Sequence, residues 1–323
     1  MEARRPQLAE IGLFLLVVAL PLVFTPFSAS PFGDGKLVVL VAGCLALAAS
    51  GLAADRRISI VGGALVAATL LAALFGVDPL EGLTARTTSS GGGLITVVCA
   101  VVLAALGASM PTGLRDRATR WSIGAGVAVA AIGLATRLVP AVFEELFPGS
   151  GLSGSTLGNP VFAIAFVAAA LGALLATEPP PERRWFWVSL VVMTLGLAAF
   201  GERASIVFAI GAGAIALWRL PSSRRRVARA LAVIVALLVV WQVVDPLLPL
   251  PGSLRPQLAT LSSERARFAM WEVGLRSAAE RPALGWGPGS TRSAHIANAT
   301  ASDLETSGRG VADAHNLFVN GLV

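Results

Sequence analysis

The chain has no tyrosine, one lysine, two histidines and two cysteines among its 323 residues. Charged residues are also scarce at 14%, whereas a soluble domain has about a quarter. That shortage excludes an ordinary soluble domain of this length. Cys44 and Cys99 both lie in apolar runs, so we expect small buried hydrophobic residues and neither a disulfide framework nor a cysteine metal site. Two histidines without a nearby cysteine also argue against a zinc site.

What the chain has in abundance is apolar residues, which make up 55% of it and give a mean hydropathy of +0.76. These values predict an all-α fold, a polytopic bundle of membrane helices. The single Lys36 stands against 24 arginines, a bias that we attribute to GC-rich coding because alanine, glycine and valine are also frequent. The net charge of +6 would suit nucleic acid, but the placement of the arginines along the chain argues against it.

Nine apolar windows approach the roughly 20 residues that a spanning helix needs. They cover residues 11–27, 36–54, 59–76, 93–110, 121–140, 160–177, 185–201, 204–218 and 228–248. A tenth window begins at residue 315, but the chain ends at Val323, so we expect a fragment whose last span is truncated. The first window also fits a cleaved signal peptide, because Arg4 and Arg5 precede it and small residues follow. A retained first span fits equally well.

The basic residues predict the orientation of the spans, because loops on the cytoplasmic side are rich in Lys and Arg. One set of loops and helix ends holds fourteen basic residues, whereas the opposite set holds four, namely Lys36, Arg86, Arg137 and Arg203. This alternation places the N-terminus in the cytoplasm of a bacterial cell with a multi-pass protein in the plasma (inner) membrane. We interpret the cytoplasmic cluster of residues 222–226 as an anchor to lipid headgroups.

Three regions follow from this topology: a transmembrane bundle at residues 1–245, an extracytoplasmic loop at 246–314, and the start of a truncated span at 315–323. Seven arginines in the loop are balanced by seven acids, counting Asp245, so it is not a nucleic-acid surface. Within it we predict a helix over residues 264–281, with an N-cap at Ser262-Ser263 and a stop at Pro282.

One side of this outer helix is apolar, and we expect it to lie on the spans or the headgroup region. The stripe comprises Phe268, Trp271, Leu275 and Ala278. Ion pairs are expected from Arg276 to Glu272 and to Glu280, each four residues away. Arg267 lies beside the stripe, where it can stack on Trp271 or bind phosphate through its two-pronged guanidinium.

Several outward cations are candidates for binding an anionic group at the outer leaflet. Arg203 stands in a hairpin so short that its guanidinium must lie near the membrane boundary, where an unpaired charge is costly. Glu202 could pair with it. Arg137 needs no binding role, because its long side chain can extend from the end of its span toward the membrane surface. His315 opens the last window and is either a plain helix-start residue or a general base. We interpret His295 as solvated.

Several motifs run through the chain in a fixed order. They are Phe75-Gly76-Val77-Asp78-Pro79-Leu80 with Gly91-Gly92-Gly93-Leu94, then Ser155-Thr156-Leu157-Gly158-Asn159-Pro160, the hairpin 201–205, Arg267-Phe268-Ala269-Met270-Trp271, the segment Glu280–Gly289 with its Gly285-Trp286-Gly287-Pro288-Gly289 turn, and Asp313-Ala314-His315-Asn316. The order of these motifs, their spacing and their shared location on the outward side resemble the O-antigen ligase-like superfamily of bacterial polysaccharide ligases and polymerases. The glycine element that this family has after its His-Asn pair is absent from the sequence.

The resemblance implies a glycosyltransferase at the outer face that moves a polyprenyl-pyrophosphate-linked glycan, such as one on undecaprenyl pyrophosphate, to an acceptor hydroxyl. The acceptor is a glycan, a lipid or a protein, and neither a metal nor a nucleotide sugar takes part. By the same resemblance, Arg203 and Arg267 hold the donor pyrophosphate and His315 accepts the proton of the acceptor hydroxyl. Lys36 and Arg86 would extend the donor site.

Two other readings stay open. A polymerase of the same superfamily cannot be separated from a ligase by these motifs. A transporter or flippase is a different class, but no Asp or Glu lies deep within any window, and proton-coupled carriers use such acids.

Overall fold

A computed structural model describes residues 5–25, 34–84, 93–146, 152–157, 160–178, 182–200, 204–219, 224–244, 261–283 and 285–307. Every regular element in these ranges is helical, which confirms the all-α class. The chain divides into two compact units. The first unit contains Met1–Ala9, Cys44–Met110 and Gln257–Val323, and the second unit contains Glu10–Gly43 and Pro111–Pro256.

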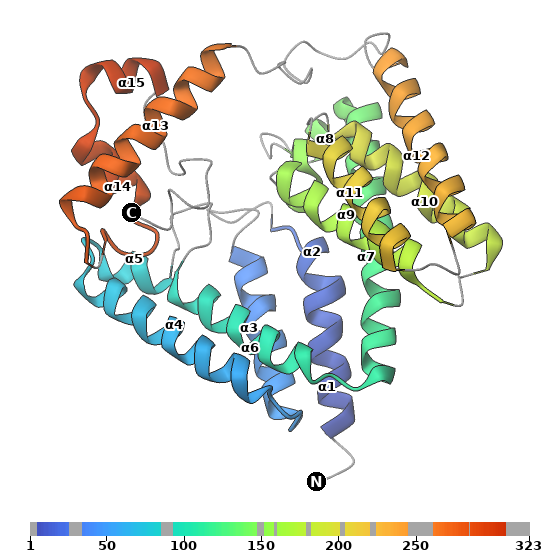
Figure 1. Ribbon diagram of the computed structural model, residues 1–323, viewed down its shortest axis with the longest axis horizontal. Helices are drawn as coiled ribbons and strands as arrows, with labels where there is room; N and C mark the ends of the chain where they lie inside the picture. The colour runs from blue at the N-terminus through green and yellow to red at the C-terminus, as the bar shows by residue number, and fades with distance from the viewer. Residues whose placement is uncertain are drawn as a thin grey trace. The chain divides into compact units, whose positions relative to one another are not determined.

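The first unit contains two groups of helices, and within each group short connections join one helix to the next. They are α4 (Arg56–Phe75), α5 (Pro79–Thr84) and α6 (Leu94–Ala108), then α13 (Leu261–Glu280), α14 (Thr291–Asn298) and α15 (Ala301–Ser307). In Figure 1, α4 and α6 run beside each other, and α13 to α15 form the orange-to-red group. Two further helices, α1 (Arg5–Phe14) and α3 (Asp34–Ala49), contribute residues to both units.

The second unit packs its longer helices around one apolar core. Its elements are a π-helical turn at Leu15–Ala19, α2 (Leu20–Leu22), α7 (Thr112–Leu138), α8 (Pro140–Leu146), a 3₁₀ turn at Leu152–Leu157, α9 (Pro160–Ala176), α10 (Arg183–Ala199), α11 (Ala204–Arg219) and α12 (Arg224–Val244). Val129, Leu171, Leu190 and Met193 in its core are fully buried.

Helix boundaries follow capping residues and prolines in the sequence. The Asp55 carboxylate accepts a hydrogen bond from the Ile58 amide (3.0 Å) at the start of α4, as an N-cap residue does. Pro79, Pro140 and Pro160 each open a helix, a position where the missing N–H costs nothing. Most predicted windows agree with the observed helices to within about five residues, although α7 begins at Thr112, well before the window 121–140. The outer helix expected over residues 264–281 corresponds to α13.

Two of the described helices, α4 and α7, are long and apolar enough to cross a membrane. Shorter apolar helices of 10–17 residues cover Pro6–Leu22, Gly35–Ala49, Leu94–Ala108, Phe162–Ala176 and Val207–Ala216. Large apolar side chains on α4, such as Val61 and Leu65, are exposed, which suits a lipid-facing helix better than the core of a soluble protein. The count of about ten spans remains a prediction.

Small residues allow the helices to pack closely. A Cβ on Gly196 of α10 would lie 2.5 Å from the Cβ of Ala130 on α7, and a Cβ on Gly62 of α4 would lie 2.3 Å from a Val101 methyl on α6. Close backbone approach of this kind is typical of membrane helices. Cys44 and Cys99 are buried at 6% and 5% exposure, which confirms their expected role as small apolar residues.

Candidate functional site

Of the five residues predicted to act on substrate, the structure fully describes only Lys36. Arg267 lies in the second turn of α13, but its side chain is outside the described set. Arg86, Arg203 and His315 lie outside the described residues altogether. The structure therefore describes the scaffold that carries Arg267 and the neighbourhood of Lys36.

Lys36 lies in the first turn of α3, and its ammonium faces the end of α2. The Nζ atom donates to the carbonyl oxygens of Leu20 (3.3 Å) and Val23 (2.5 Å). Carbonyls at a helix C-terminus have no partner inside the helix, and a cation there is stabilising. An ammonium carries three N–H groups, and these two acceptors are the ones found among the described residues.

A second contact reaches the same end of α2 from the segment before α9. Thr156 Oγ1 donates to the Pro21 carbonyl (2.7 Å), and Ser155 Oγ donates to the Val129 carbonyl (2.9 Å). Ser155 has a φ of +59°, unusual for a residue with a side chain. The Gly158-Asn159 part of this family-like motif lies outside the described residues.

The expectation that Arg137 extends toward the membrane surface is wrong. Arg137, in the last turn of α7, is only 8% exposed. Gly133 lies one turn earlier on the same face, and a Cβ there would fall 2.3 Å from the Phe200 ring. The end of α10 therefore packs closely on this face of α7.

The outer helix α13 buries a different face from the apolar stripe. Among its described side chains and glycines, the buried positions are Met270, Val273, Gly274 and Ser277, whereas Phe268 and Leu275 are 63% and 53% exposed. The stripe therefore does not form the packed face of α13 in the described structure, and contact with lipid headgroups remains a prediction. Trp271 stands edge-on to Phe268, with ring centroids 5.2 Å apart.

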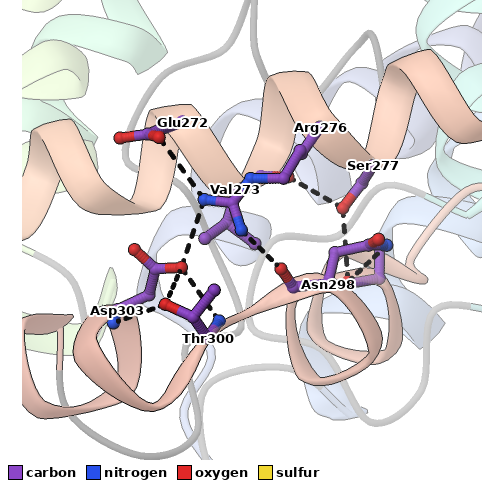
Figure 2. A network of polar contacts seen from close by, with 8 residues as sticks. Glu272, Val273, Arg276, Ser277, Asn298, Thr300 and Asp303 are labelled. Atoms are coloured by element: carbon purple, nitrogen blue, oxygen red, sulfur yellow. Dashed lines mark hydrogen bonds and ion pairs between the residues drawn. The ribbon is translucent and has the colours of Figure 1, made fainter.

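Arg276 ties α13 to the connection between α14 and α15 (Figure 2). Its guanidinium donates to the Asn298 carbonyl (2.9 Å), to Asp303 Oδ2 (3.2 Å) and to Glu272 Oε1 (3.5 Å). The predicted pair with Glu272 is thus present. The Glu280 carboxylate instead accepts from the Asn298 amide (3.0 Å). Arg276 therefore joins α13 to α14 and α15 and does more than form ion pairs on a solvated face.

The interpretation of His295 as solvated is wrong, since the side chain is 4% exposed on α14. Burial lowers its pKa, because the charged imidazolium loses hydration, while nearby Asp303 opposes that shift. The pKa of Asp303 is itself lowered, first by hydrogen bonds from Thr300 and then by Arg276. No local sequence pattern indicates this burial.

The turn between α13 and α14 is built around Trp286, which is 7% exposed. Its indole Nε1 donates to the Ser277 carbonyl on α13 (3.0 Å), and the Arg281 guanidinium lies 4.8 Å from its ring centroid. Ser277 Oγ also donates to the Ala294 carbonyl on α14 (3.2 Å). The turn and both helices therefore form one connected body.

This turn also packs on the end of α4. The Val77 amide donates to the Trp286 carbonyl (2.9 Å), and a Cβ on Gly76 would lie 2.9 Å from the Gly287 Cα. Gly289 faces Glu81, which is 8% exposed. Two motifs that the sequence offered separately, Phe75–Leu80 and the Gly285–Gly289 turn, are thus in contact. We name this contact, formed by residues 76–81 with 286–289, the outer joint.

Comparison with known families bears on the part of the chain that begins within α10. Residues 188–323 match the family model described as O-Antigen ligase. The resemblance expected from the motifs is therefore confirmed for this part of the chain. No curated protein and no solved structure matches the chain.

The O-antigen ligase region contains Arg203, Arg267 and His315, whereas Lys36 and Arg86 precede it. The family consists of bacterial membrane proteins of the glycosyltransferase type, with glycan and lipid-linked substrates. For residues 188–323 the match indicates an enzyme of this broad kind. Two features of its scaffold, the buried His295 and the outer joint, were not foreseen, because each depends on contacts between distant segments.

Proposed function

We propose that the protein transfers a polyprenyl-pyrophosphate-linked glycan to an acceptor hydroxyl at the outer face of the plasma membrane. The observation that carries the proposal is the O-antigen ligase match over residues 188–323, which includes every motif position assigned to the reaction's core. Ligation to a lipid, protein or wall polymer and extension of a repeat chain share this chemistry, and the assay below separates them.

In the proposed reaction His315 accepts the proton of the acceptor hydroxyl as its oxygen attacks the anomeric carbon. The new glycosidic bond forms while the bond from that carbon to the pyrophosphate oxygen breaks. Polyprenyl pyrophosphate leaves with the bonding electron pair. Arg203 and Arg267 stabilise the negative charge that grows on this leaving group through electrostatic attraction and charge-assisted hydrogen bonds.

Lys36 and Arg86 extend the donor site in this proposal. The contacts of the Lys36 ammonium to the Leu20 and Val23 carbonyls support the assignment, because they hold the cation in place. A cation fixed in this way meets an anion without first losing side-chain freedom.

The test is the loss of surface polysaccharide in the full-length protein. Arg267→Ala and His315→Ala are expected to abolish the polymer while membrane insertion and abundance stay normal. Arg292→Ala is the matched control, because Arg292 is exposed on the neighbouring α14. Normal polymer in either of the first two variants would contradict the assigned roles.

Reconstitution then distinguishes ligase from polymerase. The purified protein is given a lipid-linked glycan together with candidate acceptors, and the products are sized. Transfer of one glycan to a foreign acceptor indicates a ligase, whereas growth of the lipid-linked chain indicates a polymerase.

A further inference from the structure

We propose that the outer joint positions Arg267 for donor binding, with Gly76, Gly287 and Glu81 as its positioning residues. This inference rests on the proposed function, because it takes Arg267 as a ligand of the donor pyrophosphate. None of the three residues touches substrate in this proposal. They act by fixing α13 against the outer end of α4.

The first argument is that the joint is too close-packed to slide. A Cβ on Gly76 would lie 2.8 Å from the Trp286 carbonyl and 2.9 Å from the Ala72 carbonyl. A Cβ on Gly287 would lie 3.0 Å from the Gly76 Cα. These are backbone atoms, which cannot rotate away as a long side chain can. Gly287 also has a φ of +99°, which side chains disfavour.

The second argument is that the joint connects rigidly to α13. Trp286 donates to the Ser277 carbonyl, and Ser277 donates to α14, so the turn cannot move without both helices. Arg267 and Ser277 lie on one uninterrupted helix. They are ten residues apart, which is about 15 Å along a helix. The position of the joint is thereby transmitted to Arg267.

The third argument concerns the buried Glu81 in α5. Its backbone amide is held by the Asp78 carboxylate (3.0 Å), and a Cβ on Gly289 would lie 3.7 Å from its Oε1. Gly289 comes two residues before the first residue of α14. A negative carboxylate is favourable near a helix N-terminus, so Glu81 adds an electrostatic attraction to the steric fit.

Arg86 follows the end of α5 by two residues in the sequence. The joint therefore connects the segment that leads to Arg86 with the helix that carries Arg267. Two cations on separate segments bind one pyrophosphate well only if their spacing is set beforehand, because ordering them during binding costs free energy. Setting that spacing is the role that we infer for the joint.

The experiment measures binding of undecaprenyl pyrophosphate to the purified full-length protein in detergent. Gly287→Ala is expected to weaken binding about tenfold, the size typical of a misplaced binding group. Gly63→Ala is the matched control on α4, because a Cβ there meets nothing within 4 Å. Its affinity should equal that of the unaltered protein.

Spin labels at Leu74→Cys and Leu275→Cys report the geometry itself, since both positions are exposed and the native cysteines are buried. A single narrow distance distribution is expected, and Gly287→Ala should broaden it. A purely structural role would lower the unfolding midpoint but leave affinity and distance unchanged, which would overturn the proposal. If Gly287→Ala fails to accumulate, Glu81→Gln replaces it, with an expected two- to fivefold loss of affinity, about the effect of a charge near a helix end.

Arg267→Ala in the same binding assay separates the two proposals. Unchanged binding in Arg267→Ala would refute the donor role of Arg267, and the joint proposal with it. Weaker binding in Arg267→Ala together with unchanged binding in Gly287→Ala and Glu81→Gln would refute only the role of the joint.

Discussion

Three cations in the described structure, Lys36, Arg226 and Arg276, donate to backbone carbonyls at the end of another helix. Lys36 reaches Leu20 and Val23 at the end of α2. Arg226 reaches the carbonyls of Leu175 and Thr177 at the end of α9, and Arg276 that of Asn298, the last residue of α14. Terminal carbonyls need such partners where water is scarce. These side chains therefore stabilise the packing of the helices that they join.

Arg276→Ala is expected to destabilise the outer helices by about 2 kcal/mol, because a charged hydrogen bond to a carbonyl and a partly buried ion pair are lost. Thermal unfolding of the purified protein measures the change. Arg292→Ala, from the exposed face of α14, should stay within about 0.5 kcal/mol. Equal midpoints for the two variants would show that the network in Figure 2 contributes nothing.

The buried His295 makes stability depend on pH. Its folded pKa is lowered from 6.5 by burial, so the unfolded chain binds the proton more readily. The stabilising contribution is complete above about pH 6.5 and is lost as the pH falls through the folded pKa. Asp303, whose pKa is also lowered, adds a second loss below about pH 3.9.

Unfolding midpoints recorded from pH 8 to pH 4 should therefore begin to fall near pH 6.5. His295→Gln should remove this first decline. His315→Gln is the matched control, because these are the chain's two histidines, and it should keep the decline. A decline that survives in His295→Gln would mean that another group titrates there.

At the scale of helices, α12 is held to its neighbours by Arg226, which the sequence assigned to a headgroup anchor. Its guanidinium lies 5.9 Å from the Phe186 ring centroid on α10 and donates to the end of α9. One residue thus joins three helices of the second unit. Its neighbours Arg224 and Arg225 are exposed and fit the anchor role.

Arg226→Ala should lower the free energy of unfolding by about 1 kcal/mol, the typical effect of a cation at a helix C-terminus. Arg225→Ala should leave it unchanged, since an exposed arginine contributes little. Chemical denaturation in detergent provides both values. If Arg225→Ala proved the more harmful variant, the cap at the end of α9 would not be the source of the stability.

At the scale of the whole molecule, two contacts within the first unit join helix ends that the charge pattern predicts to lie on the same side of the membrane. The backbone amide of Asp55 at the start of α4 donates to the Ala105 carbonyl near the end of α6 (2.9 Å). Both of these helix ends are predicted to be cytoplasmic. The outer joint connects two ends that are predicted to face outward. Helix ends assigned to opposite sides would not meet in this way.

The orientation itself predicts the labelling of single cysteines in intact spheroplasts. Ile296→Cys, exposed on α14, should react with a membrane-impermeant maleimide, because residues 246–314 face outward. Arg225→Cys should react only after lysis. Cys44 and Cys99 are buried and provide a low background. The opposite pattern would reverse the topology.

The sequence by itself determined the helix class, the approximate helix boundaries and the family of the later part of the chain. Apolar windows, capping residues and prolines act within a few residues, so they can be read locally. Of the predicted site residues, Arg267 is placed on its expected helix and Lys36 near its expected helix start, while the roles of all five remain proposals.

Only the tertiary structure decided what surrounds each side chain. His295 and Arg137 are buried, and Gly76 contacts Gly287 across a separation of more than 200 positions in the sequence. Such contacts depend on how whole helices pack, and no local pattern encodes that packing. The sequence identifies the motifs, whereas three-dimensional packing determines that Phe75–Leu80 and the Gly285–Gly289 turn form one joint.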